Sequence, residues 1–438
     1  MKNSFFITTM GCQMNEYDSD HLAQTLINNG YSPTNDPGQA NVIIINTCTI
    51  REKAEQKALS SLGRMSDLKC KNPSLIIGLA GCLAQQKGAE LLRRFPQLDF
   101  VMGPREIGRI MEILKKLDLS HKKIAITCLD RNLPQTTTSN GFHKGKTSSF
   151  ISIMEGCNNF CSYCIVPYVR GREIYRSHLD ILSNAQNLIQ EGVREITLIG
   201  QNVNSYTWKN GKKWYFSSLL KELNRLPGLL RVRFTTSHPK DLSQNLIDCF
   251  GSLEKLCPHI HLPFQAGSNT LLKRMRRGYT RENYLELLTK LRKVVPEIAI
   301  TSDVMVGFPG ETQEDFELTL DLIEQAQFDG LFSFQYSDRK DTLSYKMNNK
   351  ISKIEKARRL AILQEQQKAI TLKKNKNLIG KVVEVLITGQ SKQGGQLSGR
   401  TDTNKICNFT CDNHKLSGLV NVMVKQGFLN SIQGEAMI

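Results

Sequence analysis

Short apolar runs alternate with helical stretches along most of this 438-residue chain, and this alternation constrains the fold more than any other feature. Such a succession is typical of βαβ units, in which helices connect parallel strands. The sequence therefore predicts an N-terminal α/β domain with a parallel sheet. The runs between Phe5 and Ile113 are strands at Phe5–Thr9, Val42–Ile45 and Leu75–Ala80, with helices near Asp18–Asn29, from Arg51 and after Leu83.

Three further regions follow. Residues 121–147 are polar and rich in turn-forming residues, which predicts an interdomain linker. Six more apolar runs separated by helical segments predict a partial (β/α)6 barrel: Phe150–Met154, Glu195–Ile199, Arg231–Thr235, His259–Leu262, Ile298–Val306 and Gly330–Gln335. After a basic helical stretch, alternating apolar and polar residues between Gly-rich turns predict a small antiparallel β-barrel. The predicted domains are 1–120, 148–375 and 378–438.

The charge and hydropathy patterns limit the function classes. The chain has 58 Lys and Arg against 41 Asp and Glu, a formal net charge of +17. This excess favours an anionic partner, nucleic acid first, although a merely basic soluble surface is the alternative. No apolar run reaches the roughly 18 residues of a membrane span, and the N-terminus lacks the pattern of a secretion signal. We therefore expect a cytoplasmic protein without a membrane partner, with a monomer as the default.

Three of the 12 cysteines form a C-x3-C-x2-C run, Cys157, Cys161 and Cys164, directly after the predicted strand Phe150–Met154. Thiols this close in sequence do not pair neatly as disulfides, and cytosolic thiols are kept reduced. Three thiolates can bind three irons of a 4Fe-4S cluster and leave the fourth iron free to chelate S-adenosylmethionine. A zinc site or buried thiols are the alternative.

Another three cysteines, Cys12, Cys48 and Cys82, each follow a predicted strand of the first domain. The ends of parallel strands meet at one edge of the sheet, where such folds bind ligands. The pattern leaves open a second three-thiolate cluster or three independent buried cysteines. The remaining six are expected to be buried or idle thiols, although Cys407 and Cys411, with His414 nearby, also allow a metal site: Cys70, Cys128, Cys249, Cys257, Cys407 and Cys411.

Segments 10–19, 46–54 and 153–157 together resemble the methylthiotransferase family of the radical S-adenosylmethionine superfamily. The resemblance continues through 193–195, 198–204, 234–239, 261–263 and 303–312, so it covers essentially the whole chain. It implies a three-domain enzyme with an RNA-binding TRAM domain at the C-terminus. One segment departs from the family, because residues 338–343 read Asp-Arg-Lys-Asp-Thr-Leu where relatives commonly have Arg-Pro-Gly-Thr-Pro.

The resemblance also implies cofactors and site residues. An auxiliary 4Fe-4S cluster would be held by Cys12, Cys48 and Cys82, and the catalytic cluster by Cys157, Cys161 and Cys164. S-adenosylmethionine would bind at strand ends, through Gln201, Asn202, Ser237, Val306, Gly307 and Phe308. His238 and His261, which lie beside the barrel strands, are expected to be structural.

The activity implied is addition of a methylthio group to carbon 2 of N(6)-dimethylallyladenosine next to the anticodon of tRNA. It would use two molecules of S-adenosylmethionine and an electron donor such as a flavodoxin or ferredoxin. Phosphate contacts are expected from the basic stretch Lys350–Lys376 and from Lys273, Arg274, Arg276, Arg277 and Arg281. The alternatives are a sister enzyme acting on threonylcarbamoyladenosine or a ribosomal-protein aspartate, a non-catalytic iron–sulfur RNA-binding protein, and a zinc-dependent RNA-binding module.

Overall fold

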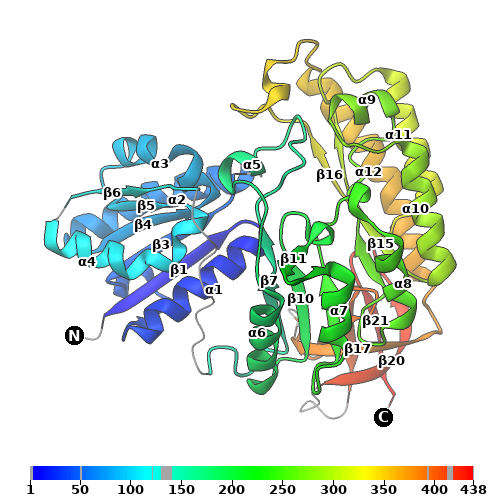
Figure 1. Cartoon of the computed structure of the whole chain (residues 1–438), viewed down its shortest axis with the longest axis horizontal. Helices are drawn as coiled ribbons and strands as arrows, with labels where there is room; N and C mark the ends of the chain where they lie inside the picture. Colours follow the sequence, from blue (N-terminus) through cyan, green and yellow to red (C-terminus); the bar gives the residue numbers. More distant parts are fainter. Residues whose placement is uncertain are drawn as a thin grey trace.

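The N-terminal sheet contains six parallel strands in the order β2-β1-β3-β4-β5-β6 (Figure 1). The computed structural model describes residues 3–49, 52–120, 122–129, 141–391, 394–411 and 418–437. The strands are β1 Ser4–Met10, β2 Ser32–Pro33, β3 Val42–Thr47, β4 Ile76–Gly81, β5 Phe100–Met102 and β6 Ile124–Ile126. The helices are α1 Gln13–Asn28, α2 Glu52–Lys71, α3 Cys82–Arg94 and α4 Ile110–Ser120.

Helices cover both faces of this sheet because its central strand is apolar on both sides. Ile43 and Ile45 of β3 face a cluster completed by α2 and α3, whereas Val42 and Ile44 face a cluster completed by α1 and α4. The predicted parallel sheet is therefore confirmed. The predicted linker is wrong at its start, because β6 lies within 121–147 and pairs with β5. The short apolar stretch of β6 is surrounded by polar residues, which is why the pattern did not predict a strand there. Residues 130–140 of the predicted linker lie outside the described residues.

The central domain has the predicted six strands in two parallel sheets, β7-β10-β13 and β14-β15-β16. A single bridge from Val232 to Leu256 lies between them. The strands are β7 Ser148–Ser152, β10 Glu195–Ile199, β13 Arg231–Phe234, β14 His259–His261, β15 Ala299–Val306 and β16 Gly330–Gln335. The outer helices are α6 His178–Gln190, α7 Phe216–Asn224, α8 Gln244–Ser252, α10 Arg281–Val294, α11 Gln313–Ala326 and α12 Lys353–Lys376.

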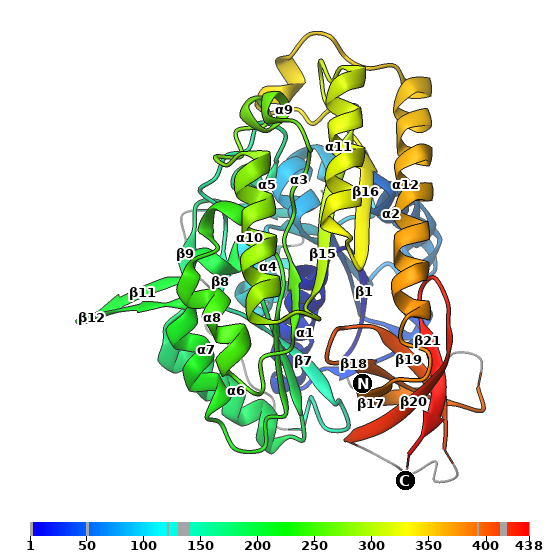
Figure 2. The same cartoon turned by 90° about the vertical axis from the view of Figure 1, so that its right-hand side faces the viewer.

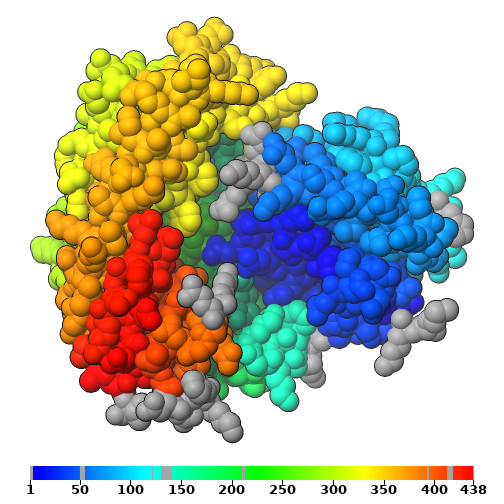
Figure 3. Space-filling model, turned by 180° about the vertical axis from the view of Figure 1, so that it is seen from behind, coloured from blue at the N-terminus to red at the C-terminus, as the bar shows by residue number. Residues whose placement is uncertain are grey.

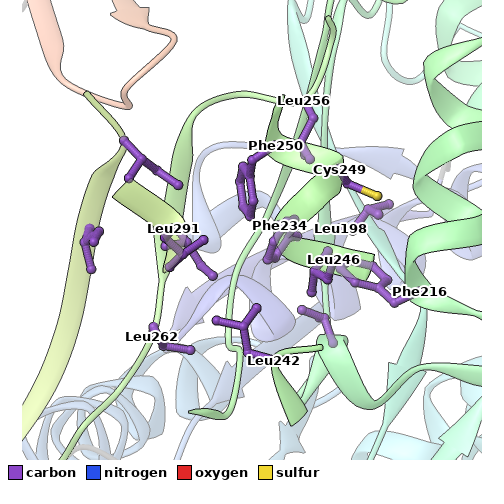
Figure 4. Close-up of a cluster of buried hydrophobic side chains, with 14 of the residues drawn as sticks. Leu198, Phe216, Phe234, Leu242, Leu246, Cys249, Phe250, Leu256, Leu262 and Leu291 are labelled. Carbon is purple, nitrogen blue, oxygen red and sulfur yellow. The ribbon is translucent and has the colours of Figure 1, made fainter. Parts of the chain in front are cut away.

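Smaller elements lie between these units. Two antiparallel pairs were not predicted, β8 Met154–Glu155 with β9 Ile174–Tyr175, and β11 Thr207–Asn210 with β12 Lys212–Tyr215. Two short helices, α5 Val166–Val169 and α9 Asn269–Arg274, follow the cysteine run and β14. The apolar core lies between strands and outer helices, and Figure 4 shows Cys249 in it, in the same cluster as Leu198, Phe216 and Leu246. Cys249 is therefore a buried core thiol, as expected.

The C-terminal strands form a closed barrel in the order β17-β18-β19-β21-β20, below the C-terminal end of α12 (Figure 2). The alternating runs Lys381–Thr388, Gln396–Thr401, Lys405–Thr410 and Leu419–Lys425 predict the first four strands, whereas the fifth, β21, was missed. The strands are β17 Val382–Gln390, β18 Leu397–Thr401, β19 Ile406–Thr410, β20 Leu419–Gly427 and β21 Ile432–Ala436. No helix in the described residues is both long and apolar enough to cross a membrane.

Two buried arginines of β13 join this barrel to the central domain. Arg231 donates from Nη1 to the carbonyl of Arg400 at 2.7 Å. Arg233 donates from Nη2 to the carbonyl of Thr401 at 2.6 Å and from Nε to Oε2 of Glu195 at 2.8 Å. Each guanidinium thus donates to groups that are buried or at the interface, and these hydrogen bonds offset the cost of removing its charge from water.

Candidate functional site: two thiol triads

The structure brings Cys12, Cys48 and Cys82 together at one edge of the N-terminal sheet. They follow β1, β3 and β4, which are neighbours in the sheet, and Cys48 is hydrogen-bonded to both other thiols. Parallel strands end at the same edge, so adjacency in the sheet converts a wide sequence spacing into proximity. We call these three cysteines the N-terminal triad.

Two asparagines and a glycine shape the backbone around the N-terminal triad. Oδ1 of Asn15 accepts a hydrogen bond from the backbone N–H of Cys12 at 3.2 Å, and its Nδ2 donates to Oδ1 of Asn46 at 3.1 Å. Gly81, before Cys82, has φ +92°, and a Cβ there would lie 2.5 Å from Oδ1 of Asn46. A side chain at this position would therefore be strained in conformation and would clash.

The charges around the N-terminal triad favour thiolates. The thiols of Cys12 and Cys82 each lie within hydrogen-bonding reach of the Cys48 thiol, and Arg170 adds positive charge. Together they lower the pKa of Cys12 to about 5 and that of Cys82 to about 7, while the pKa of Cys48 is raised. Thiolate is the form that binds metals, and the lowered pKa values of Cys12 and Cys82 favour that form.

The second group, which we call the central triad, consists of Cys157, Cys161 and Cys164 in the loop between β8 and α5. The loop is fixed by hydrogen bonds from the N–H of Cys157 to the carbonyl of Gly171 at 3.1 Å and from the N–H of Cys164 to the carbonyl of Cys161 at 3.0 Å. Burial raises the pKa of Cys157 to about 11 and that of Cys164 to about 12. These thiols must lose protons when they bind metal.

The donor sets fit iron–sulfur clusters better than single ions. No set of three or more His, Cys, Asp or Glu side chains within the described ranges could hold one metal ion. Each thiolate of a 4Fe-4S cluster binds a different iron, so its ligands surround a larger group. A structural zinc site needs four protein ligands on one ion, whereas each triad supplies three thiols. Cys407 lies in the apolar interior of the C-terminal barrel, and His414 lies outside the described residues.

Three of the six side chains expected to contact S-adenosylmethionine lie at strand ends on the side of the central triad. Oε1 of Gln201 accepts a hydrogen bond from the N–H of Gly156, the residue before the triad, at 2.6 Å. Asn202 donates to Oδ2 of Asp241 at 2.8 Å, but its Oδ1 is buried without a partner among the described residues. Oγ of Ser237 is also buried without such a partner. Because unpaired buried polar atoms are costly, these two suit a polar ligand.

The other three residues offer backbone rather than side chains. Val306 and Phe308 are fully buried in apolar clusters. Gly307 has φ +73°, and a Cβ there would lie 2.1 Å from Cγ of Lys356. Its N–H donates to Oε2 of Glu311 at 2.5 Å. The contact of these three residues with S-adenosylmethionine stays a prediction, and it would involve the main chain.

His238 and His261, which were both expected to be structural, differ in their surroundings. Nδ1 of His261 is 3.1 Å from Oγ1 of Thr301, which fits a structural role. Nδ1 of His238 accepts a hydrogen bond from the N–H of Lys240 at 3.2 Å, which places the proton on Nε2, and Nε2 is buried with no partner among the described residues. Burial and the charge of Arg277 lower the pKa of His238 to about 2, so the ring is neutral. Nε2 of His238 is thus a free donor beside Ser237, which sequence reasoning missed.

Arg277 was also misassigned. It is buried, and it donates from Nη1 to Sγ of Cys161 at 3.3 Å and from Nη2 to the carbonyl of Pro263 at 2.9 Å. Arg281 is buried as well and forms an ion pair with Asp321. The expected phosphate contacts are therefore wrong for Arg277 and Arg281. Only the placement of the cysteine loop in space could have revealed this, because 116 residues separate Arg277 from Cys161.

The basic stretch Lys350–Lys376 is partly internal too. Arg359 is buried against Glu311, and Lys374 forms an ion pair with Asp329. Lys353, Lys373 and Lys376 remain exposed on α12, as do Lys273 and Arg276 near α9. The surface available for phosphate is therefore narrower than the sequence suggested.

The departing segment 338–343 lies against the N-terminal domain. Nη1 of Arg339 is 3.4 Å from Oε2 of Glu55 on α2, and Lys87 on α3 pairs with the same carboxylate at 2.6 Å. The segment therefore contacts α2, the helix after Cys48, at a carboxylate that also pairs with α3. Seen from behind, the blue N-terminal domain and the red and orange barrel flank a recess whose floor is the green core (Figure 3).

Comparison with known proteins covers all three parts. Three family models match: Uncharacterized protein family UPF0004 over residues 4–103, Radical SAM superfamily over 151–323 and TRAM domain over 376–436. The tRNA-2-methylthio-N(6)-dimethylallyladenosine synthase of Syntrophus aciditrophicus is 49% identical over 437 residues, covering 100% of this chain and 95% of the relative. The synthase of Geotalea uraniireducens is 45% identical over 430 residues, covering 98% of each.

Solved structures agree on the fold. The radical S-adenosylmethionine methyltransferase TsrM from Kitasatospora setae, with cobalamin and a 4Fe-4S cluster bound, superposes with a TM-score of 0.57 at 14% identity, covering 79% of this chain and 77% of that chain. The cobalamin-dependent radical enzyme OxsB gives 0.54 at 12% identity, covering 79% and 54%. At such identity the likeness concerns the fold alone. The full-length relatives show that this chain belongs to the tRNA-2-methylthio-N(6)-dimethylallyladenosine synthase family, as a tRNA methylthiotransferase of the radical S-adenosylmethionine superfamily.

Proposed function

We propose that this enzyme adds a methylthio group to carbon 2 of N(6)-dimethylallyladenosine next to the anticodon of tRNA. The observation that carries the proposal is the presence of two thiol triads at strand ends of adjoining domains, connected through Arg170, which contacts both Cys82 and Glu155. Glu155 lies two residues before Cys157. Two neighbouring clusters suit a reaction that must activate an aromatic C–H bond and also supply sulfur.

The triads would each hold one 4Fe-4S cluster. A cluster held by Cys157, Cys161 and Cys164 would supply an electron to S-adenosylmethionine, and one held by Cys12, Cys48 and Cys82 would supply sulfur. The chain's own contribution is to bind and orient. Oδ1 of Asn202, Oγ of Ser237 and Nε2 of His238 would hold polar groups of S-adenosylmethionine, since all three are buried beside the central triad without partners among the described residues.

The RNA would approach from the recess between the N-terminal domain and the C-terminal barrel. Exposed lysines of α12 and the match to a TRAM domain support contacts to the phosphate backbone. Such contacts position the RNA, whereas base recognition has to come from the recess itself. We further propose that the protein works in the cytoplasm as a monomer, with a flavodoxin or ferredoxin as reductant.

The test is nucleoside mass spectrometry of tRNA from a strain that lacks its own enzyme. The strain is complemented with the intact gene, with Cys157→Ala, or with Cys70→Ala as the matched control, because Cys70 is exposed and lies outside both triads. The 2-methylthio derivative of dimethylallyladenosine should appear with the intact gene and with Cys70→Ala only. If threonylcarbamoyladenosine alone gains the methylthio group, the proposed substrate is wrong. If no tRNA gains the group with the intact gene, the proposed activity is contradicted.

The cofactor count is tested separately. Iron and sulfide of anaerobically reconstituted protein should fall by about half when Cys12, Cys48 and Cys82 are all replaced by alanine, and by about half when the central triad is replaced. Use of two molecules of S-adenosylmethionine predicts one 5'-deoxyadenosine and one S-adenosylhomocysteine for each product. Unchanged iron in either triple variant would remove that triad from the proposal.

A further inference from the structure

A buried arginine lies between the two triads. Arg170 follows α5 in the central domain and is 2% exposed. Its guanidinium has three different partners: Nε is 3.4 Å from Sγ of Cys82, Nη1 is 2.5 Å from Oε1 of Glu155, and Nη2 is 2.6 Å from Oδ2 of Asp18. One side chain of the central domain therefore contacts a thiol of the N-terminal triad, a carboxylate of α1 and a carboxylate beside the central triad.

A second arginine supports this arrangement from the opposite domain. Arg105, in the N-terminal domain, donates from Nη2 to the carbonyl of Arg172 at 2.7 Å, and its Nε lies 3.7 Å from Oε2 of Glu155. Glu155 thus accepts a hydrogen bond from Arg170 at Oε1 and lies at ion-pair distance from Arg105 at Oε2. Arg105, Arg170, Glu155 and Asp18 are all buried, so water screens their charges poorly. The network fixes the guanidinium of Arg170 in place.

The contact of Arg170 with Cys82 has an electrostatic consequence. Hydrogen bonds to the sulfurs and nearby charge are among the main determinants of the potential of an iron–sulfur cluster. A donor and a positive charge at a thiolate ligand stabilise the reduced cluster, because reduction adds negative charge. The central triad has a similar contact, from Arg277 to Cys161 at 3.3 Å. Each triad therefore has one buried arginine that donates to one thiol.

We propose that Arg170 is a positioning residue that raises the reduction potential of the cluster on the N-terminal triad and fixes that cluster site against the loop of the central triad. The proposal rests on the proposed function, since it takes Cys12, Cys48 and Cys82 as cluster ligands. The two carboxylates hold the guanidinium, and Nε acts on the sulfur. Loss of Arg170 should therefore move the potential of the N-terminal cluster to more negative values.

The test needs a variant that folds. Arg170→Met alone would leave the carboxylate of Asp18 buried and unpaired, which strongly destabilises proteins. The double variant Arg170→Met/Asp18→Asn removes one charge of each sign and leaves the Arg105–Glu155 pair intact. Asp18→Asn alone is the matched control, because it keeps the donor to Cys82. Both are made in full-length protein whose central triad is replaced by alanine, so that a single cluster is observed.

The measurement is a reduction titration followed by electron paramagnetic resonance. Relative to Asp18→Asn, the double variant should show at least a tenfold lower ratio of reduced to oxidised cluster at a fixed potential, equivalent to about 59 mV for one electron. Equal potentials in the two proteins would overturn the proposal. If the double variant binds no cluster, Arg170→Gln/Asp18→Asn, which also removes the positive charge, is measured instead: a negative shift supports the proposal, and an unchanged potential overturns it.

Iron content tests the assignment of Cys12, Cys48 and Cys82 as cluster ligands separately from the role of Arg170. If the parent protein without the central triad binds no iron, the N-terminal triad does not hold a cluster, and the proposed function fails irrespective of Arg170. If the parent binds iron and its potential is insensitive to Arg170, only the role of Arg170 fails. Iron content and potential therefore separate the two conclusions.

Discussion

Arg233 offers the sharpest test of how the C-terminal barrel is attached to the central domain. Arg233→Met removes hydrogen bonds to the carbonyls of Thr401 and Asp402, and it leaves the carboxylate of Glu195 buried and unpaired. Removing one partner of a buried ion pair costs about 3–5 kcal/mol. For a domain of roughly 150–250 residues, each 1 kcal/mol lowers the Tm by about 2–4 °C, so the transition should fall by roughly 6–20 °C.

The assay is thermal unfolding followed by circular dichroism, with matched variants. Arg225→Ala is the surface control, because Arg225 is 73% exposed in its ion pair with Glu222. That change should cost less than about 1 kcal/mol. Replacing both charges, Arg233→Met/Glu195→Gln, should recover much of the loss, because no unpaired charge remains in the interface.

Arg233 does not anchor the barrel if Arg233→Met melts within about 2 °C of the parent protein, a shift that corresponds to roughly 1 kcal/mol or less. The unpaired carboxylate is not the source of the loss if the double replacement is no more stable than the single one. Limited proteolysis supplies a second readout, because a detached barrel should be cleaved from the end of α12 before the core is cut.

Three other predictions concern the triads, the RNA surface and segment 338–343. In cluster-free protein at pH 7, iodoacetamide should modify Cys12 roughly 20-fold faster than Cys157. A thiol with a pKa of about 5 is almost all thiolate at this pH, whereas one with a pKa of about 11 is about 10⁻⁴ thiolate. The lower nucleophilicity of the thiolate with the lower pKa offsets part of this difference. Raising the pH to 9 should speed only Cys157, and equal rates in peptide mass spectrometry would contradict these pKa values. Lys373→Ala/Lys376→Ala should reduce the slope of log K against log salt for tRNA by about 2, whereas Lys116→Ala on α4 should leave it unchanged. Arg339→Ala should increase proteolysis at Lys340, and equal cleavage would show that the contact with Glu55 does not hold this segment.

The positions of the cysteines could be predicted from sequence because the rule involved is geometric. Cys12, Cys48 and Cys82 each follow a strand, and neighbouring parallel strands end at one edge whatever their spacing in the chain. The six central strands were predictable for the same reason, since each is a continuous apolar run bounded by helices. Short strands in polar surroundings were not, which is why β6 and β21 were missed.

The arginines could not be assigned from sequence because a charged residue type does not reveal its partner. Arg170 lies 88 residues from Cys82, Arg277 lies 116 from Cys161, and Arg233 lies 168 from Thr401. No local pattern connects such pairs, and the default for a cation is an exposed position. Arg277 and Arg281 were therefore grouped with Lys273, Arg274 and Arg276, none of which is buried. The same limit applies to His238, whose free Nε2 depends on which atoms surround it.

The net charge of +17 consequently has two separate uses. Part of it lies inside the molecule, where Arg105 and Arg170 join the N-terminal and central domains and Arg231 and Arg233 join the central domain to the barrel. These guanidiniums form several fixed hydrogen bonds each, a geometry that lysine cannot reproduce. Exposed lysines of α12 and exposed cations near α9 are among the described residues that can attract RNA. Since the buried arginines hold the domains together and the exposed lysines do not, salt should weaken RNA binding well before it separates the domains.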